Sequence, residues 1–246
     1  PGTSPWDVLF HQLMLHAAGQ LVDGAPHHLQ QRMKPCSCRP KFQWHYVNHH
    51  IAHAASAYLC APFDRSAVMT LDGRGEYAST TYGVANGTDY QEIGHVDVPH
   101  SLGLLYEDVT EYLGFLRSSD EYKVMALASY GQPAYVDYFA KKIHVLENGQ
   151  YRIDPLDLEK HFGPTRRRGG PLEAWHFDLA HSLQAVLEST VAKLATWLHQ
   201  ATGLENLCMA GGVALNCVMN ARLLSSTPFK EIWVQPAAGD AGTALG

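Results

Sequence analysis

The sequence predicts an α/β protein with mixed sheets, built as two lobes of which the first is incomplete. Three short strand-like runs precede an amphipathic helix, which gives a βββα order. Two later apolar runs, each followed by glycine, are typical of buried parallel strands. The first part of the chain instead carries helical patterns broken by proline. We therefore assign residues 1–63 to the mostly helical remainder of a first lobe and residues 64–246 to a second lobe.

Two helices are expected in the first lobe. Residues 6–21 have an amphipathic spacing of leucines, and residues 44–61 resume a helical pattern that Pro62 ends. The second lobe then begins with the runs SAVMTLDG, EYASTTYGV and YQEIGHVDV, separated by glycine-containing turns. We interpret these runs as an antiparallel meander of three strands.

The segment SLGLLYEDVTEYLGF predicts the helix that follows the meander. Ser101 suits the N-cap, and one helical face is apolar, with Leu102, Leu105, Val109 and Leu113. A hairpin with an Asn148–Gly149 turn comes next, in IHVLENGQYRI. A long helix from His176 ends at Gly203, and the runs NLCMAGG and EIWVQP are then expected as parallel strands.

Composition excludes several classes of function. The chain has 246 residues, 46% of them hydrophobic, and no apolar run near the ~20 residues of a membrane span. Its net charge of -6 argues against nucleic-acid binding. Five cysteines without CxxC spacing, and an opening that lacks the pattern of a signal peptide, favour the reducing cytoplasm. We expect no membrane or nucleic-acid partner, and a homodimer is compatible with the sequence.

The stretch NHHIAHAASAYL holds three histidines in a run that is otherwise typical of a buried helix. His49 and His53 are four residues apart, so their side chains lie on one helical face and can bind one metal ion. His50 points about 100° away from His49 and is left out of this pair. The spacing alone does not decide between ligands and ordinary helix histidines, because the chain holds 15 histidines.

Two glycine-rich strand ends supply the carboxylates. In LDGRGE, Asp72 is a hard oxygen ligand at a strand end, beside Gly73 and Gly75, whose backbone amides can approach a phosphate; a plain hairpin turn is the alternative. In QPAAGDAG, Asp240 reaches the same cleft as a fourth ligand. Two imidazoles and two carboxylates suit iron, manganese or zinc.

A third turn, in MAGGVALN, joins a buried strand to a helix through Gly211 and Gly212. The start of that helix favours an anion, although a close-packed turn is an equally good interpretation. The order βββα followed by parallel strands, after a helical remnant, is how the second lobe of an actin-like ATPase (ribonuclease H-like) fold begins. In that fold, nucleotide phosphates bind between the two lobes.

Six ordered motifs carry a resemblance to a known family: HHIAHAASA, LDGRGE, SLGLLYEDVTEYLGF, DEYKVMALASYG, NLCMAGGVALN and VQPAAGDAG. Together they resemble the O-carbamoyltransferases of nodulation and antibiotic biosynthesis, which are related to the transferase that makes threonylcarbamoyladenosine in tRNA. The resemblance runs from about Trp44 to Gly246, with a variable middle at residues 134–174.

The resemblance implies a reaction. Such enzymes use carbamoyl phosphate and ATP to form carbamoyladenylate in a separate C-terminal domain, and the actin-like domain transfers the carbamoyl group to a hydroxyl of a sugar or natural product. It also implies site residues: an iron or similar divalent metal at His49, His53, Asp72 and Asp240, and nucleotide contacts at the glycines above and at Glu76, Lys123 and Asn216.

The family pattern is incomplete in this chain. We expect its opening strand pair, with the family's proposed catalytic histidine, and its adenylate-forming domain to lie outside the chain, which alone would not complete the reaction. The general base is unassigned. Two rival hypotheses remain, a metal-dependent hydrolase and a nucleotide-binding module without catalysis.

Overall fold

The structure is a computed structural model that describes residues 21–22, 25–26, 45 and 47–246. It divides into two compact units, 1–48 and 49–246. The described part of the first unit contains an antiparallel pair of two-residue strands, β1 (Leu21–Val22) and β2 (Ala25–Pro26). The helix predicted over residues 6–21 lies outside the described residues except for Leu21, which belongs to β1.

The second unit is organised around a five-stranded mixed sheet in the order β5-β4-β3-β8-β9. Strands β3 (Arg65–Leu71), β4 (Ala78–Asn86) and β5 (Asp89–Asp97) form the predicted antiparallel meander. Strands β8 (Asn206–Ala210) and β9 (Glu231–Val234) continue the sheet in parallel with β3. The α/β class, the mixed sheet and all five of these strands are therefore confirmed.

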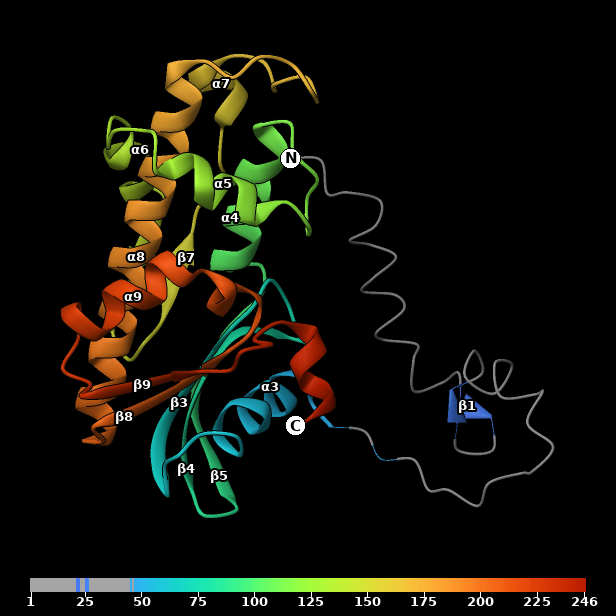
Figure 1. Ribbon diagram of the computed structural model, residues 1–246, viewed down its shortest axis with the longest axis vertical. Coiled ribbons are helices and arrows are strands. Elements are labelled where there is room, and N and C mark those ends of the chain that lie inside the picture. Colours follow the sequence, from blue (N-terminus) through green and yellow to red (C-terminus); the bar gives the residue numbers. More distant parts are fainter. Residues whose placement is uncertain (1–20, 23–24, 27–44, 46) are drawn as a thin grey trace. The chain divides into compact units, whose positions relative to one another are not determined.

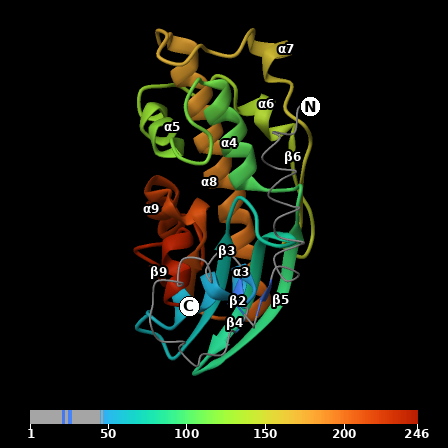
Figure 2. The same ribbon diagram turned by 90° about the vertical axis from the view of Figure 1, so that its right-hand side faces the viewer.

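Helices cover both faces of this sheet (Figures 1 and 2). Helix α3 (His49–Tyr58) packs on one face, where Ala54 and Ala57 contact Val68 and Cys208. The long helix α8 (Ala174–Thr202) and α4 (Leu102–Tyr112) belong to the larger core on the other face. Consecutive strand residues point to opposite faces, so β3 contributes Val68 to one core and Met69 to the other.

The ends of these helices follow their sequence signals. The hydroxyl of Ser101 accepts a hydrogen bond from the backbone N–H of Leu104, which confirms the predicted N-cap of α4. Gly203 ends α8 in the left-handed conformation, with φ 65°. The predicted hairpin is also present, with β6 (Ile143–Val145), β7 (Tyr151–Ile153) and positive φ at Asn148 and Gly149.

Three short helices were not predicted: α5 (Glu121–Ala128), α6 (Val136–Ala140) and α7 (Leu158–Phe162). The helix expected directly after Gly212 is a 3-10 helix, η2 (Gly212–Leu215), and α9 (Cys217–Ser226) begins only after it. The segment from Asp240 likewise forms a 3-10 helix, η3 (Asp240–Ala244), which packs against α3. Within the described residues, no helix is long and apolar enough to cross a membrane.

Candidate metal centre

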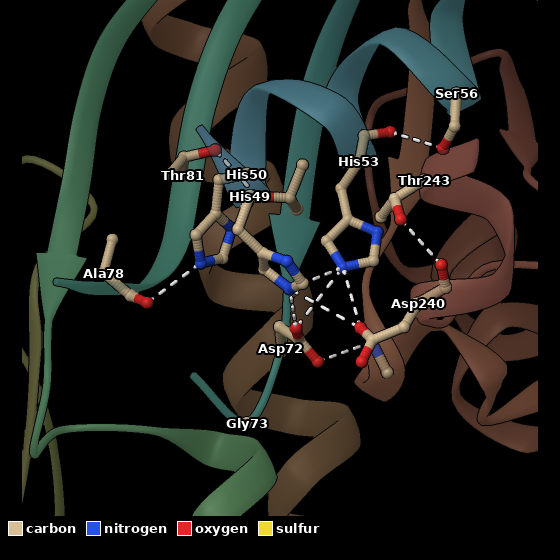
Figure 3. A network of polar contacts seen from close by, with 12 residues as sticks. His49, His50, His53, Ser56, Asp72, Gly73, Ala78, Thr81, Asp240 and Thr243 are labelled. Carbon is tan, nitrogen blue, oxygen red and sulfur yellow. Dashed lines mark hydrogen bonds and ion pairs between the residues drawn. The ribbon is translucent and has the colours of Figure 1, made fainter. Parts of the chain in front are cut away.

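Three segments that are distant in the sequence meet where β3 ends. Helix α3 presents His49 and His53 from one face, Asp72 directly follows β3, and Asp240 begins η3. Figure 3 shows the two imidazoles and two carboxylates turned toward one another. One ligand atom from each residue lies within 4.8 Å of all the others. The structure thus brings together the four residues that the sequence assigned to a metal ion.

Short distances join these four side chains. The Nε2 atom of His49 lies 2.7 Å from Asp72 Oδ2 and 3.5 Å from Asp240 Oδ1. The Nε2 atom of His53 lies 3.3 Å and 3.6 Å from the same two oxygens. The two Nε2 atoms are 3.1 Å apart. Donor atoms about 2.1 Å from one ion lie ~3.0 to 3.4 Å apart in octahedral or tetrahedral geometry. The observed distances, from 2.7 to 3.6 Å, differ from this range by only a few tenths of an ångström, so small shifts would let these atoms hold one divalent ion.

Hydrogen bonds within the cluster shift the pKa values of its side chains in the direction opposite to the effect of burial. Burial alone would raise the pKa of Asp72, but hydrogen bonds from His49 and His53 lower it well below its ordinary value. Burial alone would lower the pKa of His53, but hydrogen bonds to Asp240 and Asp72 raise it to about 9. The His53 hydrogen bond also lowers the pKa of Asp240. Without metal, a proton on His53 therefore compensates the carboxylates.

Asp72 also connects the cluster to the MAGG turn. Its Oδ1 accepts a hydrogen bond of 2.9 Å from the backbone N–H of Gly212. A Cβ atom on Gly212 would lie 2.8 Å from that oxygen, so glycine is needed for this approach. Gly211 has φ 98°, and a Cβ atom there would collide with the backbone oxygen of Leu71. Both glycines thus allow the turn to lie close to the end of β3.

The third histidine of the run does not belong to the cluster. His50 is 1% exposed, and its ring binds Thr70 and Ala78. Figure 3 shows it turned toward Ala78 and away from the carboxylates. Gly75, which was predicted to face a phosphate, is buried against this imidazole: a Cβ atom on Gly75 would lie 2.8 Å from His50 Cδ2. Gly75 therefore makes room for His50.

A cavity of about 400 Å³ lies beside the cluster. Five of the predicted site residues line it: Asp72, Gly73, Gly212, Asn216 and Asp240. Apolar side chains contribute much of the remaining wall, among them Tyr106, Leu187, Val213 and Leu215. A mostly apolar cavity with a few convergent polar groups is typical of a small-molecule site.

Four predicted nucleotide contacts, Gly75, Glu76, Lys123 and Gly211, are not among the described residues that line this cavity. Both carboxylate oxygens of Glu76 accept from the backbone N–H of His49, at 3.0 and 3.1 Å, so Glu76 caps the start of α3. Lys123 forms a 2.8 Å ion pair with Asp120 and is 41% exposed.

The sequence analysis did not identify Glu107, which lines the cavity, or Gln184, which contacts the cavity residue Asn216. Glu107 on α4 accepts from Arg117 Nε at 2.9 Å and from Arg74 at 3.4 Å. Gln184 is buried on α8 and exchanges hydrogen bonds of 2.7 and 3.0 Å with the amide of Asn216. A glutamine within the leucine stripe of a long helix was the available signal, because a buried amide requires partners.

The comparisons with known proteins agree with the motifs. Residues 28–246 match the family model described as Carbamoyltransferase N-terminus. The nodulation protein NolNO of Sinorhizobium fredii is 44% identical over 209 residues, which are 82% of this chain and 30% of that protein. NolO of Bradyrhizobium diazoefficiens is 42% identical, over 81% of this chain and 37% of that protein. The chain thus spans about a third of the length of these relatives.

Solved structures resemble the fold at low identity. A full-length HypF crystallised in a phosphate- and nucleotide-bound form superposes with a TM-score of 0.52 and 16% identity, over 87% of this chain and 43% of that one. HypF from T. kodakarensis gives a TM-score of 0.50. At this identity the likeness concerns the fold alone.

Proposed function

Because the chain belongs to the carbamoyltransferase N-terminus family, we propose that it carries the site at which an activated carbamoyl group is transferred to an acceptor hydroxyl. The proposed donor is carbamoyladenylate, made from carbamoyl phosphate and ATP in an adenylate-forming domain outside this chain. The proposed acceptor is a sugar or another natural product. The observation that carries the proposal is the convergence of His49, His53, Asp72 and Asp240 beside a cavity of nucleotide-compatible size.

We further propose that the fold is actin-like, with residues 64–246 as its second lobe and residues 1–63 as the remainder of the first. The βββα order of β3, β4, β5 and α4 and the parallel addition of β8 and β9 support this. Helix α3, which this boundary places in the first lobe, packs on the same sheet and supplies both histidines. The candidate site thus lies at the proposed boundary of the two lobes.

The residues of the chain have separable roles in this proposal. His49, His53, Asp72 and Asp240 would hold the divalent ion, which we propose to be iron, with manganese or zinc as alternatives. When bound, such an ion neutralises phosphate charge and orients the donor. The Gly212 N–H fixes the second oxygen of Asp72, which aims the carboxylate at the cluster.

The cavity wall contributes binding and orientation. Gly73 and Gly212 leave the backbone accessible beside Asp72, so a phosphate can approach closely there. Since adenylate is a good leaving group, the remaining tasks are alignment of the acceptor and removal of its proton. No described residue is assigned as that base.

The test is a transfer assay. The full protein is incubated with carbamoyl phosphate, ATP and a panel of hydroxylated acceptors, and mass spectrometry looks for the gain of one carbamoyl group. Transfer should require ATP and should be lost in Asp72→Asn, which retains the size and the Gly212 contact but removes the charge. Asp154→Asn is the matched control, because this partly exposed carboxylate also pairs with a histidine, His144, but does not line the cavity.

The assay also separates the rival functions. Hydrolysis of carbamoyl phosphate or of an acceptor that persists when ATP is left out would indicate a metal-dependent hydrolase. Tight nucleotide binding by the full protein, with no transfer to any acceptor, would indicate a binding module. Either result would refute the proposed transfer.

A further inference from the structure

We propose that His50 is a positioning residue of the candidate metal centre: its imidazole locks helix α3 onto strands β3 and β4 and thereby fixes His49 and His53 relative to Asp72. This inference rests on the proposed metal site. It adds a role for the one histidine of the HHIAH run that is not a proposed ligand.

Both ring nitrogens of His50 are engaged. Nε2 lies 2.9 Å from the carbonyl oxygen of Ala78, and Nδ1 lies 2.6 Å from Thr70 Oγ1. A carbonyl oxygen can only accept, so Nε2 carries a hydrogen and donates. In the neutral ring Nδ1 then accepts from the Thr70 hydroxyl, whose oxygen in turn lies 2.7 Å from Thr81 Oγ1. The chain of hydrogen bonds has one direction, from Thr81 on β4 to Thr70 on β3 to His50.

These hydrogen bonds lie close to the proposed ligands, so they can control how the ligands are placed. Thr70 precedes Asp72 by two residues on the same chain segment, and His50 directly follows His49. The ring of His50 lies 5.7 Å from that of His49 and 6.2 Å from that of His53. A bond between Thr70 and His50 therefore joins the two segments that carry three of the four proposed ligands, within three residues of each.

The LDGRGE turn is built around the same ring. The carbonyl of Ala78 accepts both from His50 Nε2 and from the backbone N–H of Gly75, the latter at 2.8 Å. A side chain on Gly75 would occupy the space of the imidazole. The ring of His50 thus contacts Thr70, which precedes Asp72, and Gly75 and Ala78, which follow it. These contacts constrain the backbone on both sides of Asp72.

Apolar packing alone would not supply this constraint. Ala54, Ala57 and Tyr58 hold α3 against the sheet, but the hydrophobic effect is non-directional. It sets the distance between helix and sheet and leaves the axial position and rotation of the helix weakly determined. Directional hydrogen bonds fix both. Those of Glu76 and Gln235 act on the helix backbone at His49 and Ser56, whereas those of His50 join the side of the helix to the β3 segment that leads into Asp72.

The experiment compares two Thr→Val variants of the full protein. Thr70→Val removes the hydroxyl that binds His50 and leaves every proposed ligand in place. Thr80→Val is the matched control: Thr80 is equally buried on β4, its hydroxyl lies 2.8 Å from that of Tyr151, and it faces the other side of the sheet. Co²⁺ serves as the probe, with affinity and absorption spectrum measured by titration and stability by urea unfolding.

We expect Thr70→Val to weaken Co²⁺ binding by about 10-fold or more and to alter the spectrum, as loss of a contact behind a metal ligand typically does. Thr80→Val should bind within about twofold of wild type, although both variants lose a buried hydrogen bond. His50→Gln, which retains a donor at the Nε2 position, should bind more tightly than His50→Ala.

Two results would overturn the inference, and they differ in meaning. If the wild type binds Co²⁺ and Thr70→Val binds it as tightly as Thr80→Val does, His50 serves the fold alone and the metal site stands. If the wild type binds no Co²⁺, the metal site and the role of His50 in it are both wrong, whereas carbamoyl transfer is still decided by its own assay.

Discussion

Lowering the pH from 8.5 to 6.5 should weaken the binding of Co²⁺ to the full protein by about tenfold for each pH unit. The reason is His53, whose side chain is fully buried and whose pKa in the metal-free protein is raised to about 9. A histidine must lose its second proton before it binds a metal, so proton and metal compete for the same nitrogen. At pH 7 only about 1% of a group with that pKa is deprotonated.

The sign can be checked on the metal-free protein. A pKa raised from 6.5 to about 9 means that the folded state binds the proton more tightly than the unfolded state does. This contribution to stability is fully present below pH 6.5 and is lost as the pH rises through 9. Its upper value is about 3 kcal/mol, from 1.36 kcal/mol per pKa unit. Metal affinity thus rises over the range in which metal-free stability declines.

Calorimetric titration in two buffers of different ionisation enthalpy measures the proton count directly. We expect about one proton released per ion near pH 7.5. His95→Gln provides the control, since His95 is a 40% exposed histidine that pairs with Glu92 away from the cluster. An affinity that is constant within about twofold between pH 6.5 and 8.5, or the release of less than half a proton, would show that His53 carries no such proton.

Three substitutions test other parts of the site. Gly211→Ala should lower the free energy of unfolding in urea by about 3 kcal/mol or more, because φ is 98° and a Cβ atom would collide with the Leu71 carbonyl. Its control is Gly87→Ala, at φ 62° with open space around it, which should lower that free energy by about 1 kcal/mol. Asn216→Ala should lower the free energy of unfolding by about 1 to 2 kcal/mol through loss of the α9 N-cap; an unchanged urea midpoint would contradict this. Lys123→Ala should leave nucleotide affinity, measured by fluorescence titration, within about twofold of wild type, since Lys123 pairs with Asp120 and does not line the cavity. A tenfold loss of affinity would show that Lys123 contacts the nucleotide.

The fold was predictable where periodicity was strong. The alternation and apolar runs of β3, β4 and β8 each reflect the burial of nearly whole strands, and the leucine stripe of α8 reflects its central place in the core. The short helix α5 buries only Val124 and Ala128, which is too little to mark a helical face. Its formation depends on packing against α8, which no local pattern reveals.

The clustering of the four candidate ligands was predictable, whereas the partners of the neighbouring histidine were not. Helical geometry alone places His49 and His53 on one face and turns His50 away. The contacts of His50 with Thr70 and Ala78 depend on how α3 lies across two strands, a tertiary arrangement that the sequence pattern does not encode. The pairing of Lys123 with Asp120 likewise depends on α5, which was not predicted, so the sequence did not reveal this partner.

Of the four glycines in the two turns beside Asp72, two line the cavity and two serve the packing of the fold. Gly73 and Gly212 line the cavity, and Gly212 donates to Asp72. Their neighbours serve packing, because Gly75 makes room for His50 and Gly211 lets the turn approach β3. A glycine in a phosphate-type motif therefore need not face a phosphate. Since Gly75 borders the ring that we propose to position α3, a side chain there would disturb the proposed metal centre through His50, without touching a proposed ligand.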